Sequence, residues 1–231
     1  MPIGDDNSGR TLVPFVNYLL IATNIIVFIF LQGMGTNEAF LMSFSTVPQE
    51  ILSGSDIITG GLGPSPEPVY VTILTSMFMH GSIGHIAGNM LYLWIFGDNL
   101  ENVMGHFKYL TFYLICGVLA TLSHVYASQI LNSALLIPSL GASGAISGVL
   151  GGYMVLFPKN KVRVFAIRTI INVPAVVSLG IWIALQLLGW MSSMGQGSGE
   201  SGGVAFAAHI GGFIAGVVLV KFFANKQPSI A

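Results

Sequence analysis

Six stretches of the chain are apolar over a length that could cross a hydrocarbon core, which takes roughly 20 residues of helix. They lie near residues 14–32, 83–100, 108–129, 141–157, 170–190 and 204–222. Most of the charged residues fall in the segments between them. The pattern therefore predicts an all-α polytopic membrane protein with six transmembrane helices, in a single domain over residues 1–231.

The composition agrees with a lipid environment. Of the 231 residues, 53% are hydrophobic and only 7% are charged, whereas about a quarter of the residues in soluble domains are charged. The net charge of −1 provides no basic surface for nucleic acid. The single cysteine, Cys116, excludes a disulfide framework and a cysteine-based metal site. The first apolar stretch is too long for a signal peptide and lacks a small-residue cleavage site, so we interpret it as a retained helix.

The basic residues predict the orientation of the chain in the membrane. With six spans, all eight Lys and Arg residues fall on one side: Arg10, Lys108, Lys159, Lys161, Arg163, Arg168, Lys221 and Lys226. The loops on the other side contain Glu38, Glu50, Asp56, Glu67 and Glu200 and no basic residue. By the positive-inside rule, both termini are expected in the cytoplasm. Without an evident transit peptide or a large soluble extension, a bacterial cytoplasmic membrane is the expected location.

Two loops on the outer side differ from ordinary connections. Residues 33–70 form a long first loop with apolar stretches, and we expect part of it to rest in the membrane interface. Residues 192–203 are rich in Gly and Ser, which is typical of a flexible segment. This second loop is interpreted either as a movable cap or as a plain connector.

Four polar side chains fall within the predicted spans at a similar depth: His85, Asn89, Ser143 and His209. At a helical rise of about 1.5 Å per residue, each lies roughly 18–24 Å from the cytoplasmic end of its span. Polar and ionisable groups at membrane depth are costly, and they mark function by default. Three different helices thus contribute to one layer in the outer half of the membrane.

Glycines beside two of these residues predict close helix packing. Gly141 and Gly144 flank Ser143, and Gly212 and Gly216 follow His209 at a four-residue spacing. Small residues at this spacing allow two membrane helices to approach closely. We therefore expect the fourth and sixth spans to cross near Ser143 and His209.

Ser143 and His209 suit nucleophilic catalysis. A serine hydroxyl becomes a good nucleophile when a base within hydrogen-bond reach takes its proton, and histidine is a suitable base. Ser143 would begin a helix, where unpaired N–H groups can stabilise an oxyanion together with Asn89 and His85. No carboxylate shares their depth, so a Ser–His dyad is predicted. The alternatives are a serine that bonds its own helix backbone and polar side chains that only join helices.

The motifs carrying these residues resemble those of the rhomboid family of intramembrane serine proteases. The resemblance covers nearly the whole chain and rests on LTSMFMHGSIGHIAGNM (74–90), LENVMGHFKYL (100–110), GASG (141–144) and AHIGGFIAG (208–216). It implies a six-helix rhomboid-like bundle that cuts transmembrane segments of other membrane proteins without a cofactor or a metal. The expected partners are these substrates and the lipid bilayer, and the sequence does not predict an oligomeric state.

By this resemblance Ser143 is the nucleophile, His209 the general base, and His85 and Asn89 bind the oxyanion. Gly141, Gly144, Gly212 and Gly216 support the site, and His80 supports the first loop or is a loop histidine without a catalytic role. The chain departs from the family at Ser147, where many relatives carry an aromatic residue that stacks on the catalytic imidazole. The first loop also lacks a Trp-Arg pair found in some members. The orientation of His209 is therefore open, and another aromatic residue could substitute.

Other polar residues are expected to play no part in the chemistry. His106 and His124 are expected near opposite ends of the third span, away from the layer of four polar side chains, and are interpreted as interface histidines. Asp98 and Glu101 are interpreted as partners of Lys108 or of solvent. The competing functions are a non-catalytic rhomboid-like factor that binds or remodels membrane proteins, and a transporter. The first usually lacks the serine or the histidine, and the second usually has charged residues or broken, repeated helices at mid-depth.

Overall fold

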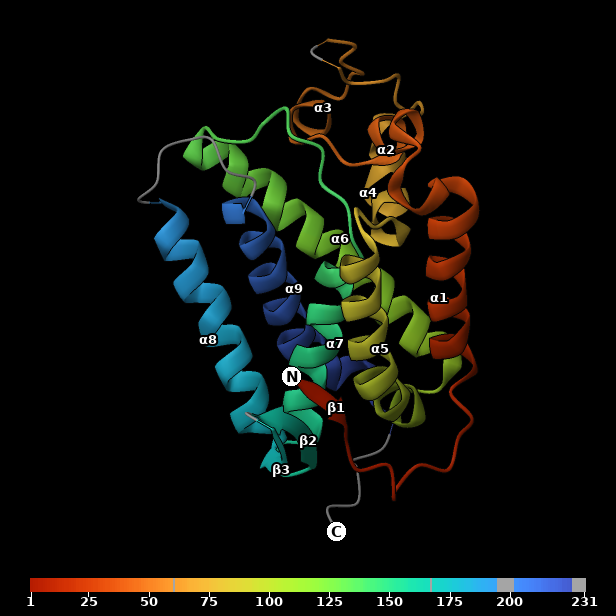
Figure 1. Ribbon diagram of the computed structural model, residues 1–231, viewed down its shortest axis with the longest axis vertical. Coiled ribbons are helices and arrows are strands. Elements are labelled where there is room, and N and C mark those ends of the chain that lie inside the picture. Colours follow the sequence, from red (N-terminus) through yellow and green to blue (C-terminus); the bar gives the residue numbers. More distant parts are fainter. Residues whose placement is uncertain (60, 167, 195–201, 226–231) are drawn as a thin grey trace.

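The computed structural model describes residues 1–59, 61–166, 168–194 and 202–225 (Figure 1). The longer helices are α1 (Phe15–Ile26), α5 (Ile83–Met104), α6 (His106–Leu131), α7 (Ser143–Leu156), α8 (Ala175–Met194) and α9 (Gly202–Phe223). A π-helical turn, Val27–Leu31, extends α1. The prediction of a mostly helical protein is therefore confirmed.

Three of these helices are long and apolar enough to cross a membrane, namely α6, α8 over Ala175–Ser192 and α9 over Phe206–Phe223. The apolar stretches Phe15–Leu31 and Ser143–Leu156 are shorter.

The fifth predicted span was placed too early in the chain. Residues 170–174 belong to a strand, β3 (Thr169–Pro174), which pairs with β2 (Lys161–Ala166) in an antiparallel hairpin. The run of isoleucine and valine in β3 is apolar enough to imitate a membrane helix, but β-branched side chains also favour strands. The strand β1 (Pro2–Gly4) joins the other edge of β2, and we call this end of the molecule the sheet end.

The opposite end, which we call the loop end, contains the long first loop (Figure 1). Its apolar stretches form α2 (Glu38–Phe44) and α3 (Pro48–Ser53), and α4 (Thr72–Thr75) lies between the 3₁₀ turns Val69–Val71 and Ser76–Phe78. A further 3₁₀ turn, Gly33–Gly35, follows α1. Of the predicted cap at 192–203, residues 195–201 lie outside the described residues.

The short helix α7 lies at the centre of the bundle, where α5, α6 and α9 pack around it (Figure 1). All of its residues from Gly144 to Tyr153 are buried. A helix buried on every side in an apolar bundle is held by shape, so its neighbours must fit closely. The first residue of this central helix is Ser143, which faces the loop end.

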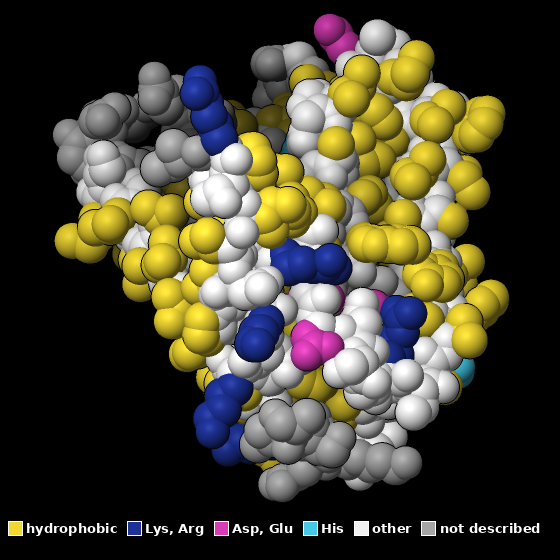
Figure 2. Space-filling model, turned by 60° about the horizontal axis from the view of Figure 1, so that its bottom comes forward, with side chains coloured by type: hydrophobic (Ala, Val, Ile, Leu, Met, Phe, Trp, Pro, Cys, Tyr) yellow, Lys and Arg dark blue, Asp and Glu magenta, His cyan; other side chains and the backbone are white. Residues whose placement is uncertain are grey.

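The flanks of the bundle expose large apolar side chains. Phe30 is 76% exposed beyond α1, and on α8 Ile181 and Leu188 are 57% and 60% exposed. Figure 2, which brings the sheet end forward, shows apolar side chains on the flanks and basic side chains across that end. A soluble monomer rarely exposes apolar surface of this extent, so the flanks fit a membrane protein.

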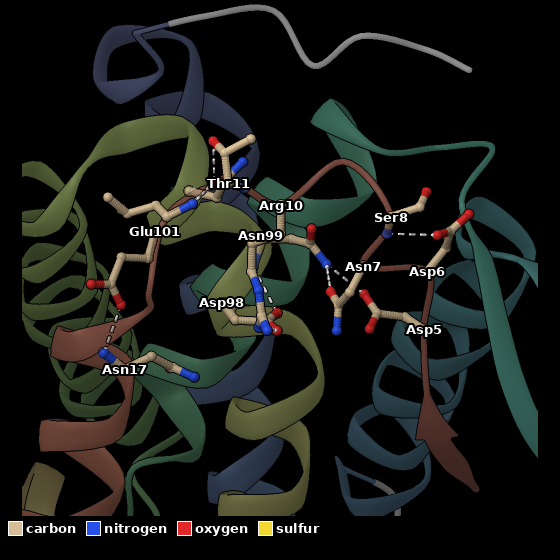
Figure 3. Close-up of polar contacts among 12 residues, drawn as sticks. Asp5, Asp6, Asn7, Ser8, Arg10, Thr11, Asn17, Asp98, Asn99 and Glu101 are labelled. Atoms are coloured by element: carbon tan, nitrogen blue, oxygen red, sulfur yellow. Dashed lines mark hydrogen bonds and ion pairs between the residues drawn. The ribbon is translucent and has the colours of Figure 1, made fainter.

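The N-terminal segment lies across the sheet end and is hydrogen-bonded to α5 and α7 (Figure 3). Asn99 of α5 donates hydrogen bonds from Nδ2 to Asp5 Oδ2 at 2.8 Å and to Asn7 Oδ1 at 2.6 Å. Tyr153 of α7 donates to the same carboxylate oxygen of Asp5 at 2.6 Å. Burial raises the pKa of Asp5 to about 7, although the hydrogen bond from Tyr153 acts in the opposite direction.

The acidic residues of α5 have partners that differ from those expected. Asp98 forms an ion pair with Arg10 of the N-terminal segment, not with Lys108. The fully buried Glu101 accepts hydrogen bonds from the backbone N–H groups of Val16 and Asn17, at 2.9 and 2.7 Å. It thereby caps the N-terminus of α1, where unpaired N–H groups favour a negative charge. His106 contacts the same carboxylate.

Candidate functional site

Ser143 and His209 meet at the loop-end terminus of α7. Ser143 Oγ lies 2.8 Å from Nε2 of His209, which projects from α9. The two residues are 66 positions apart in sequence, so only helix packing brings them together. A hydroxyl at this distance from a ring nitrogen can pass its proton to it.

The turn before Ser143 depends on a glycine. Gly141 has a φ of 137°, which side chains other than hydrogen rarely allow. Its N–H donates to the carbonyl oxygen of Ser76 at 2.9 Å. A Cβ atom at Gly141 would lie 3.0 Å from His85 Cε1 and 3.5 Å from Ser143 Oγ. The absent side chain therefore leaves open the space that His85 and Ser143 both border.

A glycine seam holds α9 against α7, and we use this name for Gly144, Gly148, Gly212 and Gly216. A Cβ atom at Gly212 would overlap the carbonyl oxygen of Gly144, and one at Gly216 would overlap that of Gly148. Side chains at these positions would force the two backbones apart. Because His209 lies one turn before Gly212, the seam sets the distance between His209 and Ser143.

The two oxyanion candidates lie one turn apart on α5. The Nε2 atom of His85 is 3.1 Å from the position that a Cβ of Gly141 would take, which places the ring beside Ser143. Asn89 is buried, and its Nδ2 group has no hydrogen-bond partner among the described residues. A buried amide donor without a partner is costly to a folded protein. Such a donor is available to a ligand.

His80 contacts His85: the two rings meet edge to face, with centroids 5.1 Å apart. Gln32, which follows α1, exchanges two hydrogen bonds of 2.9 Å with the backbone N–H and carbonyl of His80. His80 thus connects the first helix to the site. Neither the apolar pattern nor a motif indicates a role for Gln32.

Two residues of α8 surround the other side of the imidazole of His209. The hydroxyl of Ser147, at the position where many relatives have an aromatic residue, donates to the carbonyl oxygen of Ser143 at 2.6 Å. Trp182 takes the place of the missing aromatic residue, with its ring 5.9 Å from that of His209 and tilted by 42°. Gln186 Oε1 lies 2.8 Å from His209 Nδ1. Sequence reasoning missed Gln186, although it is a polar residue inside an apolar helix.

A cavity of about 50 Å³ adjoins the hydroxyl of Ser143 and the ring of His209. Its wall includes Thr121 and His124 of α6. His124 was expected to lie away from the site, but α6 crosses the bundle so that its outer part passes beside Ser143. Within the described ranges, no three His, Cys, Asp or Glu side chains come together as a metal site would require.

Comparison with known proteins adds independent information. The family model of the Rhomboid domain matches residues 67–226. The chain is 33% identical over 149 residues to Rhomboid protein 1, mitochondrial, of Saccharomyces cerevisiae, which covers 64% of this chain and 40% of that protein. It is 29% identical over 209 residues to Rhomboid protease GluP of Bacillus subtilis, covering 89% of this chain and 35% of that protein.

A third relative is the Presenilin-associated rhomboid-like protein, mitochondrial, of Homo sapiens. It is 27% identical over 177 residues, covering 72% of this chain and 43% of that protein. The matched region therefore spans less than half the length of each of these relatives.

Proposed function

This chain belongs to the rhomboid family, since the Rhomboid domain matches more than half of its length, and we propose that it is an intramembrane serine endopeptidase. Ser143 is the nucleophile and His209 the general base of a dyad. The observation that carries the proposal is the 2.8 Å contact between Ser143 Oγ and His209 Nε2. The proposed substrates are transmembrane segments of other membrane proteins.

The reaction begins when Ser143 Oγ attacks the carbonyl carbon of the scissile bond and its proton passes to His209 Nε2. The tetrahedral intermediate collapses when the imidazolium returns this proton to the leaving amine, which leaves an ester on Ser143. Water then enters, gives a proton to His209 and attacks the ester. His209 then returns this proton to Ser143 Oγ as the bond between Oγ and the acyl carbon breaks, which releases the second product and restores the hydroxyl of Ser143.

The negative charge of each intermediate needs donors that are already in place. We propose three donors for this charge: the backbone N–H of Ser143 at the start of α7, the side chain of His85, whose ring borders the same space as Ser143, and Nδ2 of Asn89, which has no hydrogen-bond partner among the described residues. The first N–H groups of a helix have no partner within the helix. Together these donors can stabilise the oxyanion.

We propose a six-span topology in which α1, α5, α6, α7, α8 and α9 cross the membrane. The sheet end is cytoplasmic in this proposal, because the described basic residues lie there. A bacterial cytoplasmic membrane is the proposed location. Cysteines introduced one at a time at exposed Ser8 and Ser55, with Cys116 replaced by alanine, test the orientation. An impermeant maleimide should label Ser55→Cys in intact bacteria and leave Ser8→Cys unlabelled. The reverse pattern would invert the topology.

Substrates are proposed to reach the dyad laterally, beside α8, with the segment 192–203 lifting as a cap. The exposed apolar face of α8 supports this route, since that helix packs mainly on α9. A disulfide between cysteines placed on α8 and α5 should abolish cleavage of membrane substrates and leave labelling of Ser143 by a small fluorophosphonate intact. Undiminished cleavage would contradict the route.

The helical peptide bond of a substrate is shielded by its own hydrogen bonds, so it must unwind before Ser143 can attack. Small or helix-breaking residues near the cut should therefore favour cleavage. The non-catalytic alternative is less well supported, because both Ser143 and His209 are present and in contact.

The deciding experiment compares cleavage of a model transmembrane substrate in liposomes by the wild type, Ser143→Ala and His209→Ala. Each variant should lose on the order of 10⁴-fold or more of the activity. Ser147→Ala, one turn along α7, is the matched control and should keep its activity. Equal cleavage by all proteins would indicate another nucleophile, and client binding without cleavage would favour the non-catalytic function.

A further inference from the structure

The hydrogen bond between Gln186 and His209 plays no part in the dyad as described so far. Gln186 comes from α8, four residues after Trp182, so both side chains lie on the same face of that helix. Its Oε1 atom lies 2.8 Å from Nδ1 of His209, on the opposite side of the ring from Ser143. A polar side chain at membrane depth costs free energy and commonly marks a functional position.

The chemistry of the two atoms fixes the direction of the proton. A carbonyl oxygen can only accept a hydrogen bond, so Nδ1 of His209 must carry the hydrogen. A neutral imidazole then has its lone pair on Nε2, the atom that faces Ser143 Oγ at 2.8 Å. The contact with Gln186 therefore selects the tautomer in which His209 can accept the proton of Ser143.

No other described group accepts a hydrogen bond from Nδ1 of His209 and so selects its tautomer. Ser147, at the position where the family often has a stacking aromatic residue, is bonded to the backbone of its own helix. Among the residues that the structure describes, no carboxylate is hydrogen-bonded to His209. Trp182 can restrict the tilt of the ring, but an aromatic carbon surface does not choose between the two ring nitrogens.

We propose that Gln186 is a positioning residue for His209, so that α8 holds the base in its active tautomer and orientation. This inference rests on the proposed function, because it assumes that His209 is the base of the dyad. Gln186 does not touch the substrate; it acts through His209. In a serine protease with a full triad a carboxylate occupies this position, whereas a neutral amide orients the ring without adding a charge.

A consequence concerns the location of α8. This helix packs mainly on α9 and exposes Ile181, Leu185 and Leu188. A helix on the edge of the bundle can move more easily than the central α7. Outward movement of α8 would break the contact between Gln186 and His209 Nδ1. The orientation of His209 therefore depends on α8 lying against α9, as it does in this structure.

The test measures kcat, KM and the rate of fluorophosphonate labelling of Ser143 for Gln186→Met and Gln186→Glu. Methionine keeps the length of the side chain and removes the strong acceptor. We expect kcat and the labelling rate of Gln186→Met to fall roughly 10- to 100-fold, with KM within about twofold, because a misplaced base affects the chemical step. Gln129→Met, at an exposed position of α6, is the matched control and should behave as the wild type.

An ionised glutamate is an acceptor only, so its carboxylate can replace the amide oxygen of Gln186 as the acceptor for Nδ1 of His209. Gln186→Glu should therefore keep kcat within about tenfold of the wild type. The acidic limb of its rate profile should move to higher pH, because a carboxylate at Nδ1 holds a second proton on the imidazole. A side chain at position 186 that did not contact Nδ1 of His209 in the working enzyme would leave this limb unchanged.

Wild-type kcat in Gln186→Met would overturn the proposal, as would an equal loss in Gln129→Met or a change confined to KM. Thermal unfolding of each variant in detergent shows whether a loss of activity comes from misfolding, and Gln186→Glu provides a second variant if Gln186→Met fails to fold. If Ser143→Ala abolishes labelling while Gln186→Met is labelled at the wild-type rate, only the proposed role of Gln186 is contradicted. If Ser143 is not labelled in the wild type, the proposed dyad is contradicted.

Discussion

Buried polar groups at the sheet end differ in their hydrogen bonding from those beside the proposed dyad. At the sheet end, Asn99 has partners in Asp5 and Asn7, and Glu101 accepts from two backbone N–H groups (Figure 3). At the loop end, Nδ2 of Asn89 and both ring nitrogens of His80 lack a hydrogen-bond partner among the described residues. Asn89 and Asn99 belong to the same helix, α5, so the difference arises from their surroundings.

This contrast separates stability from function. A satisfied buried network contributes to the stability of the fold, whereas an unsatisfied donor detracts from it. Functional sites commonly keep such groups, and the rest of the protein compensates. We infer that the sheet end holds α1, α5 and α7 together, while the loop end keeps donors free for the reaction.

The glycine seam holds α9 against α7, so a substitution in it should affect both stability and activity and have the largest effect. Gly212→Ala should destabilise the protein by about 3 kcal/mol, because the new methyl group overlaps the carbonyl oxygen of Gly144. Activity should fall roughly 100-fold or more as His209 shifts. Gly180→Ala on α8, where no atom lies within 4 Å of the added Cβ, should be neutral or stabilising by up to about 1 kcal/mol. Thermal unfolding and substrate cleavage measure the two effects, and similar behaviour of both variants would contradict the seam.

A matched pair of asparagines on α5 should sharpen the comparison. Asn89→Ala should lower kcat about 100- to 1000-fold through loss of an oxyanion donor. Its free energy of unfolding should change by less than about 1 kcal/mol, because Nδ2 has no hydrogen-bond partner among the described residues. Asn99→Ala should destabilise by about 1–3 kcal/mol, since it leaves Asp5 and Asn7 without their donor. Its kcat should stay near that of the wild type.

The outcome that would erase the distinction between the two ends is a loss of stability in Asn89→Ala as large as that in Asn99→Ala. Cleavage and thermal unfolding must be measured on the same preparations, below the unfolding midpoint of both variants.

A further effect concerns the pH dependence of stability at the sheet end. Because burial raises the pKa of Asp5 to about 7, the folded protein binds a proton that the unfolded chain, with an ordinary pKa near 4, releases. Stability from this group is present below about pH 4 and is lost as the pH rises through about 7, by at most about 1.4 kcal/mol per pH unit. Asp5→Asn keeps an acceptor oxygen for Asn99 and Tyr153. The midpoint of thermal unfolding of this variant should therefore depend less on pH between about pH 5 and 8 than that of the wild type.

The neighbouring Asp6 is the control. It is exposed, and a hydrogen bond from the backbone of Ser8 lowers its pKa, so its titration falls below this range. Asp6→Asn should therefore leave the pH dependence between about pH 5 and 8 unchanged. A flat profile in the wild type would show that Asp5 does not titrate there.

The sequence by itself determined the helical character and the family, and it named Ser143 and His209 as the residues of the proposed reaction. Long apolar stretches have few alternatives to helix in a membrane, because every backbone polar group must find a partner within its own segment. The pattern failed at residues 170–174, where an apolar run of β-branched residues forms β3 instead of a helix. Apolar composition alone does not distinguish the two.

Only the tertiary structure decided which polar groups meet. The pairs Arg10–Asp98, Gln32–His80 and Gln186–His209 join segments that are 88, 48 and 23 residues apart. No local pattern encodes such contacts, because they depend on the crossing and rotation of helices that glycines and bulky side chains set together. For this reason Ser143 and His209 could be named from the sequence, whereas the residue that orients His209 became visible only when α8 was placed beside α9.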